Sequence, residues 1–432
     1  MKLKNLFFLF FLSFSFLPLY SWTNHFLGSY LSLEELDEIA KAKPVKVESI
    51  ESFLKKEADG VAKVLDEIEK ESQEKIRNYP KKPDTITFDP KDTANLRKNF
   101  LRSIRINPTI KLKLFIQEMP GHSIAGKKRL KASDVTIFDK DEYTESYIFT
   151  ELKEGGKASP LSVAASGADE PDYGHDIGLY QDNKTEFGDE FNFGIQPFGD
   201  PRLYYSSQAP FHMGFFHESG IINAAAAGYV KRTYPEWRVL QYFRLAKFAF
   251  STGHDYWGYR FMGWAMHYLG DLTQPYHSTL LPGVGTTRAL FVNFNAMIGL
   301  DGGKNAIIER LSDRHTAIEH YQYDILNEIL VAKDYENSMV QAYKKTDNDS
   351  KYPKFDLSYP REVIAKESNE RAEDLDDKIG ESKYVMIFKE QVVKKEGHSP
   401  DEESKEVDKF INQMFISFGS HLRNFARETI SK

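Results

Sequence analysis

The chain has 432 residues, of which 41% are hydrophobic and 28% are charged, and none is a cysteine. This composition is typical of a globular protein with a sizeable core, and it excludes disulfides and thiol catalysis. The formal net charge of −7 lacks the basic excess that marks tight electrostatic binding of nucleic acids, although it does not exclude a nuclease whose metals contact phosphate.

Residues 1–21 have the pattern of a secretory signal peptide. Lys2 and Lys4 precede an apolar run over residues 6–17, and Ser21 is a small residue at the expected cleavage site. The apolar run is short for a membrane-spanning helix, and serines interrupt it. We therefore expect a secreted or periplasmic protein whose mature chain, residues 22–432, begins at Trp22.

Helical periodicity predicts helices over residues 33–43 and 49–77. In the second of these, apolar side chains recur at helical spacing while Lys and Glu occupy the other face: Ile50, Leu54, Val61, Leu65 and Ile68. From residue 79 to 160, Gly and Pro punctuate short apolar runs, which predicts strands and loops. Residues 166–217 are rich in Gly, Asp and aromatic side chains, and we expect long loops there.

The second half of the chain reads as more helical. Residues 235–250 and 255–271 carry aromatic and aliphatic stripes that indicate core helices. Residues 345–403 are highly charged, which predicts exposed segments. A closing helix should pack on the core through an apolar stripe formed by Val407, Ile411, Met414, Phe418, Leu422 and Phe425.

The most informative stretch runs from residue 264 to 277 and reads WAMHYLGDLTQPYH. His267 and Asp271 are four residues apart, so a helix places this imidazole and this carboxylate side by side. Pro275 disfavours helical geometry at the preceding residue, and the resulting turn brings His277 back towards the pair. Imidazole nitrogens and carboxylate oxygens are ligands that zinc accepts, so the stretch predicts a metal site.

A second pair with the same spacing follows on another expected helix, where His315 and Glu319 share one face. Between the two pairs lies a Gly-rich, partly apolar stretch over residues 282–303. It follows His277 closely, so we expect it either to line or cover the site or to form a plain surface loop.

The string His-Tyr-Leu-Gly-Asp, followed after two residues by Gln-Pro-Tyr-His, resembles the central motif of the zinc-dependent phospholipase C and P1/S1 nuclease superfamily. The resemblance implies a mostly α-helical bundle with ligands projecting inward, here with loop and small β insertions. Phospholipases C have much less chain between their first ligands, so we expect part of residues 45–160 to be an insertion or added subdomain.

The resemblance also implies a cluster of three zinc ions. The first ion would be held by Asp172 in a Pro-Asp-Tyr segment, by His212 in an Ala-Pro-Phe-His segment, and by His267 and Asp271. Two alternatives stay open, because Asp169 lies close to Asp172 and His217 follows His212 by five residues.

The second ion would be held by His277, His315 and Glu319. The third would be held by the amino group and carbonyl oxygen of a mature N-terminal Trp22, by His25 and by the bridging Asp271. His25 follows Trp22 more closely than in the family pattern. The amine of Trp22 can ligate only if processing frees it.

A zinc cluster of this kind suits hydrolysis of phosphodiesters, with Asp172 as the general base that the resemblance implies. The spacing His-x3-Glu at residues 315–319 is the phospholipase C form, whereas the nucleases carry His-x3-Asp. We therefore expect a phospholipase C that acts on a phospholipid or membrane surface and leaves diacylglycerol. The alternatives are a P1/S1-type nuclease that acts on single-stranded nucleic acid and a non-catalytic secreted protein stabilised by zinc. No protein partner is expected.

Overall fold

The computed structural model describes residues 24–138, 144, 146–199, 204–218, 231–285, 302–381 and 402–431, with a few single positions between 220 and 300. The expected signal peptide and Trp22 lie outside these residues. Helices account for 61% of the structure and strands for 3%, which confirms the mostly α-helical fold class.

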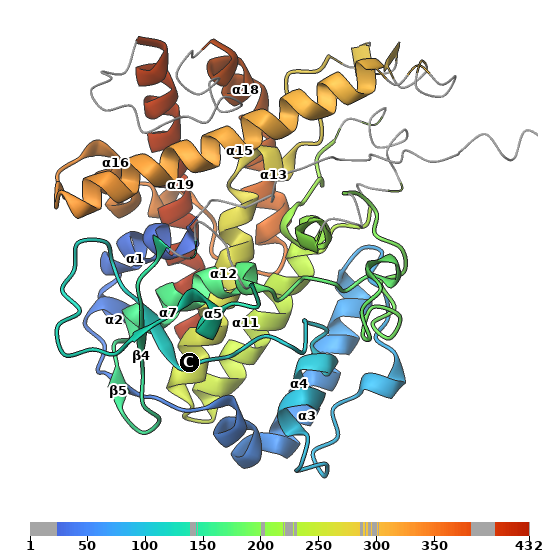
Figure 1. Ribbon diagram of the computed structural model, residues 1–432, viewed down its shortest axis with the longest axis vertical. Coiled ribbons are helices and arrows are strands. Elements are labelled where there is room, and N and C mark those ends of the chain that lie inside the picture. The colour runs from blue at the N-terminus through green and yellow to red at the C-terminus, as the bar shows by residue number, and fades with distance from the viewer. Residues whose placement is uncertain are drawn as a thin grey trace, which may run out of the picture.

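Helix α12 (Asp255–Leu272) lies at the centre of the fold and is buried from Tyr256 to Leu272. It packs against α11 (Pro235–Ser251), α7 (Pro160–Asp169) and α19 (Glu402–Ile430), and α1 (His25–Glu34) lies against both α7 and α19 (Figure 1). A helix that is apolar on all sides is stable only inside a core, which explains this central place.

The remaining helices surround this centre. In chain order, those that the structure describes are α2 (Asp37–Ala40), α3 (Ile50–Lys75), α4 (Leu96–Ser103), α5 (Ala132–Val135), α8 (Ala209–His212), α13 (Pro275–Ser278), α15 (Gly302–Val331), α16 (Ser338–Lys344), α17 (Lys366–Glu370) and α18 (Ala372–Glu381). In Figure 1 the long α15 crosses the upper part of the molecule, whereas α3 and α4 lie at the opposite end.

Several helices agree with the sequence patterns. Helices α11 and α12 begin where they were expected and end one residue later, and α3 begins and ends within two residues of its expected limits. The apolar stripe of α19 is buried, with Ile411 and Leu422 fully inaccessible to solvent. Each of these segments has a long run of large apolar side chains at helical spacing, which is the strongest signal that a sequence offers.

Four expectations are wrong. The strands and loops expected over residues 79–160 include helix α4. The helix expected over 33–43 is replaced by α1 and α2, because Asn24 caps α1 by accepting a hydrogen bond from the Leu27 N–H at 2.8 Å. The loops expected from residue 166 begin only after α7, a helix of small residues without a large apolar stripe. The exposed segments expected over 345–403 include α18, whose Leu375 and Ile379 are buried.

Residues 45–160 begin and end side by side. Strand β1 (Val45–Lys46) pairs antiparallel with β5 (Lys157–Ala158), so the two ends of this long segment meet in one short ladder. Between them, β2 (Phe115–Gln117), β4 (Phe149–Glu151) and β3 (Arg129–Leu130) form an antiparallel sheet in that order. The side chains of α3 and α4 join the main core, whereas the sheet has a small core of its own that includes Tyr173.

Among the described residues, no helix combines the length and the apolar character that crossing a membrane requires.

Candidate metal centre

Five helices and one turn bring the eight described ligand candidates together. His25 begins α1, His212 ends α8, His277 lies on α13, and α12 and α15 each supply one pair of side chains. Asp172 lies on the 3₁₀ turn Glu170–Tyr173, which follows α7 directly. Trp22, the ninth candidate, lies outside the described residues.

These side chains form three groups whose ligand atoms lie within 4.8 Å of one another. The groups, each able to hold a metal ion, are Asp172 with His212 and His267; His277 with His315 and Glu319; and His25 with His267 and Asp271. The second group has the composition that the sequence predicted. The other two share His267, whose Nε2 can bind only one ion at a time.

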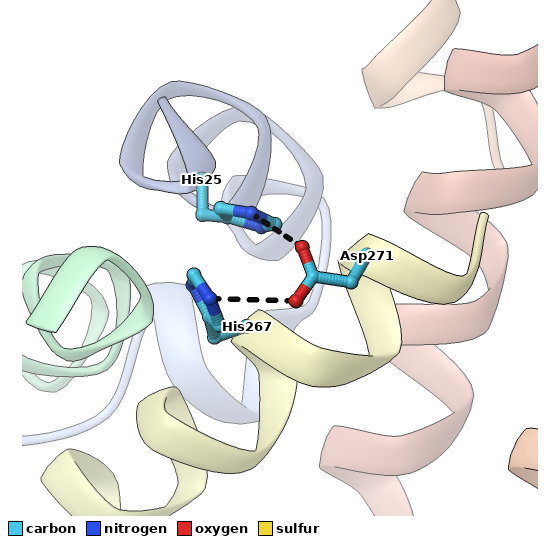
Figure 2. Close-up of side chains that lie close together, drawn as sticks. All are labelled: His25, His267 and Asp271. Atoms are coloured by element: carbon cyan, nitrogen blue, oxygen red, sulfur yellow. Dashed lines mark ion pairs between the residues drawn. The ribbon is translucent and has the colours of Figure 1, made fainter. Parts of the chain in front are cut away.

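Asp271 lies between the groups. Its Oδ1 is 3.1 Å from Nε2 of His25, and its Oδ2 is 3.0 Å from Nδ1 of His212 and 3.4 Å from Nε2 of His267. Figure 2 shows His25 on α1 and His267 on α12 turned towards the two oxygens of this carboxylate. A carboxylate that presents one oxygen to each of two histidines can bridge two metal ions.

Backbone carbonyl groups fix the tautomers of two of these histidines. The Nδ1–H of His267 donates to the carbonyl oxygen of Ala168 at 2.8 Å, and the Nδ1–H of His277 donates to that of His212 at 3.0 Å. In both neutral rings Nε2 therefore carries the lone pair that faces the cluster. Such an outer hydrogen bond is what orients a metal-binding histidine.

Each of these two Nε2 atoms faces a nitrogen of another histidine. Nε2 of His267 is 3.0 Å from Nδ1 of His212, and Nε2 of His277 is 2.9 Å from Nε2 of His315. Two nitrogens are stable at this distance when a proton or a metal cation lies between them. The donor set therefore fits a bound metal ion.

The electrostatics of the metal-free cluster lead to the same conclusion. Burial lowers the pKa of His212, but Asp271, Asp176 and Asp172 more than offset this effect and raise it to about 10. Burial also lowers the pKa of His315 to about 3 and raises the pKa of Glu319 to about 7. Without a metal, a proton on His212 supplies the positive charge that the carboxylates require, and a divalent cation can take its place.

Asp172 differs from the other ligand candidates in its access to solvent. Its side chain is 16% exposed, whereas the side chains of the other seven are at most 5% exposed. Its Oδ1 lies 3.6 Å from Nε2 of His267 and 3.8 Å from Nδ1 of His212. Among these residues, Asp172 therefore marks the side from which a water molecule or a substrate can reach the cluster.

The two alternatives from the sequence lie outside these groups. His217 contacts the carbonyl oxygen of Arg361 through Nε2 at 2.7 Å. Asp169 accepts hydrogen bonds from the Phe26 N–H at 2.8 Å and from the Gln117 side chain at 2.8 Å. The structure thus brings His212 and Asp172 into the groups, and leaves His217 and Asp169 outside them.

Sequence analysis missed the residues that support the ligands. Oδ2 of Asp176 lies 3.4 Å from Nε2 of His212 and accepts a hydrogen bond from the Tyr268 hydroxyl at 2.5 Å, while its Oδ1 pairs with the buried Arg238. The negative charge of Asp176 lies beside His212 and helps to raise the pKa of this histidine. The partners of Asp176 lie on α11 and α12, so no spacing in the sequence pointed to it.

Three further described histidines have structural contacts. His254 contacts Glu48 at 2.6 Å and Glu57 at 3.2 Å. His175 is buried edge-to-face against Trp264 with 4.5 Å between ring centroids. His421 on α19 contacts Glu367 through Nε2 at 2.9 Å.

No protein-family model, no curated protein and no solved structure matches this chain. What the centre does must therefore be argued from its own residues.

Proposed function

We propose that this protein is an exported zinc-dependent phosphodiester hydrolase of the phospholipase C type. The observation that carries the proposal is the convergence of eight buried or half-buried His, Asp and Glu side chains into three groups, two of which share His267. Imidazole-rich sets with few carboxylates favour zinc over magnesium or calcium, which prefer oxygen ligands.

Three zinc ions fit this arrangement, provided that processing frees the amino group of Trp22. His25, the partner expected for Trp22, begins α1 and lies beside the bridging Asp271. The amine would then join His25 and Asp271 as a ligand of one ion, and His267 would bind the ion shared with Asp172 and His212. Export is part of the proposal because an uncleaved chain offers no such amine.

When bound, zinc makes hydroxide available at neutral pH and stabilises the negative charge that develops on phosphoryl oxygens. The chain supplies the rest of the reaction. Asp172 reaches the solvent-facing side of the cluster, where its carboxylate can accept the proton of the attacking water. Burial raises the pKa of Asp172 well above its ordinary value, with His212 opposing the rise and Asp271 adding to it.

The choice of phospholipid as substrate is supported by Glu319, which lies 2.7 Å from Nε2 of His315. In the superfamily that the sequence resembles, a Glu at this place belongs to the phospholipases C. A nuclease remains the second candidate, because Ala-Pro-Phe-His212 resembles the nuclease segment and the same metals would serve a nucleic-acid phosphodiester. The third candidate is a non-catalytic protein that keeps zinc for stability.

Product analysis tests the proposal. The mature chain with zinc is incubated with phosphatidylcholine vesicles and, in parallel, with a single-stranded oligonucleotide. We expect release of phosphocholine that a chelator abolishes and that the His267→Ala variant lacks. The matched control is His217→Ala, whose side chain contacts a backbone carbonyl away from the groups and whose loss should leave the rate unchanged.

Release of nucleotides alone would overturn the phospholipase assignment in favour of the nuclease. Zinc bound at full stoichiometry without turnover of either substrate would favour the non-catalytic reading.

A further inference from the structure

Gln117, the last residue of β2, is buried, and its backbone N–H and both polar atoms of its side-chain amide form hydrogen bonds with one neighbouring segment. Its N–H donates to Oγ of Ser166 at 2.9 Å, and its Nε2 donates to Oδ2 of Asp169 at 2.8 Å. Its Oε1 accepts a hydrogen bond from the Tyr173 hydroxyl at 2.6 Å. The three partners belong to the end of α7 and to the turn that carries Asp172.

The contacts of Gln117 therefore surround Asp172 in the sequence without touching it. Asp169 lies three residues before this ligand candidate and Tyr173 one residue after it. Since a buried amide that loses its partners costs about 1–3 kcal/mol, the turn is held in one position relative to β2. Asp172 Oδ1 is thereby kept within 3.6 Å of Nε2 of His267.

The same hydrogen bonds reach a second part of the centre. Oδ1 of Asp169 accepts a hydrogen bond from the N–H of Phe26, the residue that follows His25, at 2.8 Å. Gln117 thus connects, through Asp169, to the first turn of α1. Both Asp172 and His25 depend on this set of contacts for their positions.

Contacts within the β2–β4–β3 sheet fix the position of Gln117. Gln117 pairs with Phe149 of β4, and the Phe149 ring packs edge-to-face on Tyr173 with 5.8 Å between centroids. Phe115 packs on Tyr173 as well, at 6.4 Å. The sheet belongs to residues 45–160, the segment to which the resemblance assigned no role.

We propose that Gln117 is a positioning residue of the metal centre, and that the β2–β4–β3 sheet serves to hold the Asp172 turn and the start of α1 around the metals. This inference rests on the proposed zinc site. The inference assigns residues 45–160 a role in metal binding. The group formed by His277, His315 and Glu319 has no contact with Gln117 and should not depend on it.

The test is zinc binding by the mature full chain with Gln117→Met, which keeps the volume of the side chain and removes its amide. Zinc content is measured at a series of buffered free-zinc concentrations, and thermal unfolding is recorded with and without zinc. We expect about tenfold weaker binding for the ions of the Asp172 and His25 groups, in line with the loss of other supporting hydrogen bonds around metals. The His277 group should keep its affinity.

Two further variants make the result specific. Thr150→Val removes a buried hydroxyl of the same sheet, one that donates to Glu118 and does not reach the turn. It should lower the unfolding temperature of the metal-free protein and leave zinc affinity unchanged. Tyr173→Phe removes the hydroxyl that donates to Gln117 and that also lies 3.3 Å from Oδ2 of Asp169. It should weaken zinc binding even if Gln117→Met fails to fold.

Unchanged zinc affinity in Gln117→Met and Tyr173→Phe would overturn the proposal, as would a wild-type chain that binds no zinc. The measurement needs no substrate. A protein that binds zinc and hydrolyses nothing would contradict the proposed function and leave the role of Gln117 standing.

Discussion

Glu236 is a carboxylate that the fold buries at a thermodynamic cost. Its side chain is 6% exposed and lies 3.5 Å from Arg361. Burial raises its pKa from the ordinary 4.5 to about 7, although Arg361 opposes this rise. The folded protein therefore holds this proton more tightly than the unfolded chain. Its contribution to stability is complete below pH 4.5 and is lost as the pH rises through 7.

Glu236→Gln should therefore stabilise the protein at high pH. We expect the free energy of unfolding to rise by about 1–3 kcal/mol at pH 8 and to change little at pH 4, because only the charged form is penalised by burial. Urea unfolding at the two pH values measures the difference. The matched control is Glu362→Gln, which removes an exposed partner of the same Arg361 and should be neutral at both. Destabilisation of Glu236→Gln at pH 8 would mean that the ion pair outweighs burial.

At the scale of single residues, the sequence revealed the ligand candidates far better than their supports. His267 and Asp271 stand in a motif whose spacing is itself the signal, because a helix places them on one face. Asp176 and Gln117 have no such spacing, since their partners come from α11, α12 and the 3₁₀ turn. A hydrogen bond between distant segments leaves no mark in a single sequence.

At the scale of helices, the centre depends on the close approach of α7 to α12. A Cβ atom at Gly263 would lie 2.3 Å from the carbonyl oxygen of Ala164 and 2.9 Å from Cα of Gly167. One turn later on α12, His267 donates its Nδ1–H to the carbonyl oxygen of Ala168 on α7. The two glycines thus set the distance at which this hydrogen bond forms.

Gly263→Ala should therefore separate the two helices and disturb the centre. The added methyl group meets backbone atoms that cannot turn aside, so we expect a loss of about 3 kcal/mol or more in the free energy of unfolding. The hydrogen bond from His267 should also be lost, and zinc affinity should fall with it. Chemical unfolding and zinc titration measure the two effects.

A glycine with free space provides the control. At Gly303, on α15, a Cβ atom would meet two side-chain carbons of Val292, at an ordinary 3.5 and 3.8 Å. Gly303→Ala should be neutral or slightly stabilising, because alanine favours helix. Equal stability of the two variants would contradict the argument from close packing.

The same helix pair shows why part of the fold could not be predicted. A long run of aromatic and aliphatic residues predicts helix α12. Helix α7 consists largely of Ala, Ser and Gly, small residues that allow the backbones of two helices to approach closely. It has no periodic apolar stripe that would have predicted it. The sequence also contains no indication that β1 pairs with β5, because each strand contributes only two residues and these show no alternating pattern.

At the scale of the whole molecule, one continuous core runs from α1 to α19. It includes side chains of α3 and α4, so the segment 45–160 is built into the body of the protein even though its two ends meet. The mostly helical class, which the resemblance implied, is confirmed. The sequence could not predict how this segment shares the core, because that depends on contacts such as the edge-to-face packing of Phe100 against Phe88 and its contact with Phe261 on α12.

The limited exposure of the ligand candidates has a kinetic consequence. Zinc held by His277, His315 and Glu319, whose side chains are at most 5% exposed, can be reached by a chelator only after the protein opens locally. The rate of zinc loss should then rise with chelator concentration and level off at the rate of that opening. Stopped-flow or slower mixing with a coloured chelator measures this curve. A rate that keeps rising in proportion to chelator concentration would show that the chelator attacks the ions directly. A plateau instead measures how fast the helices that enclose the ions open.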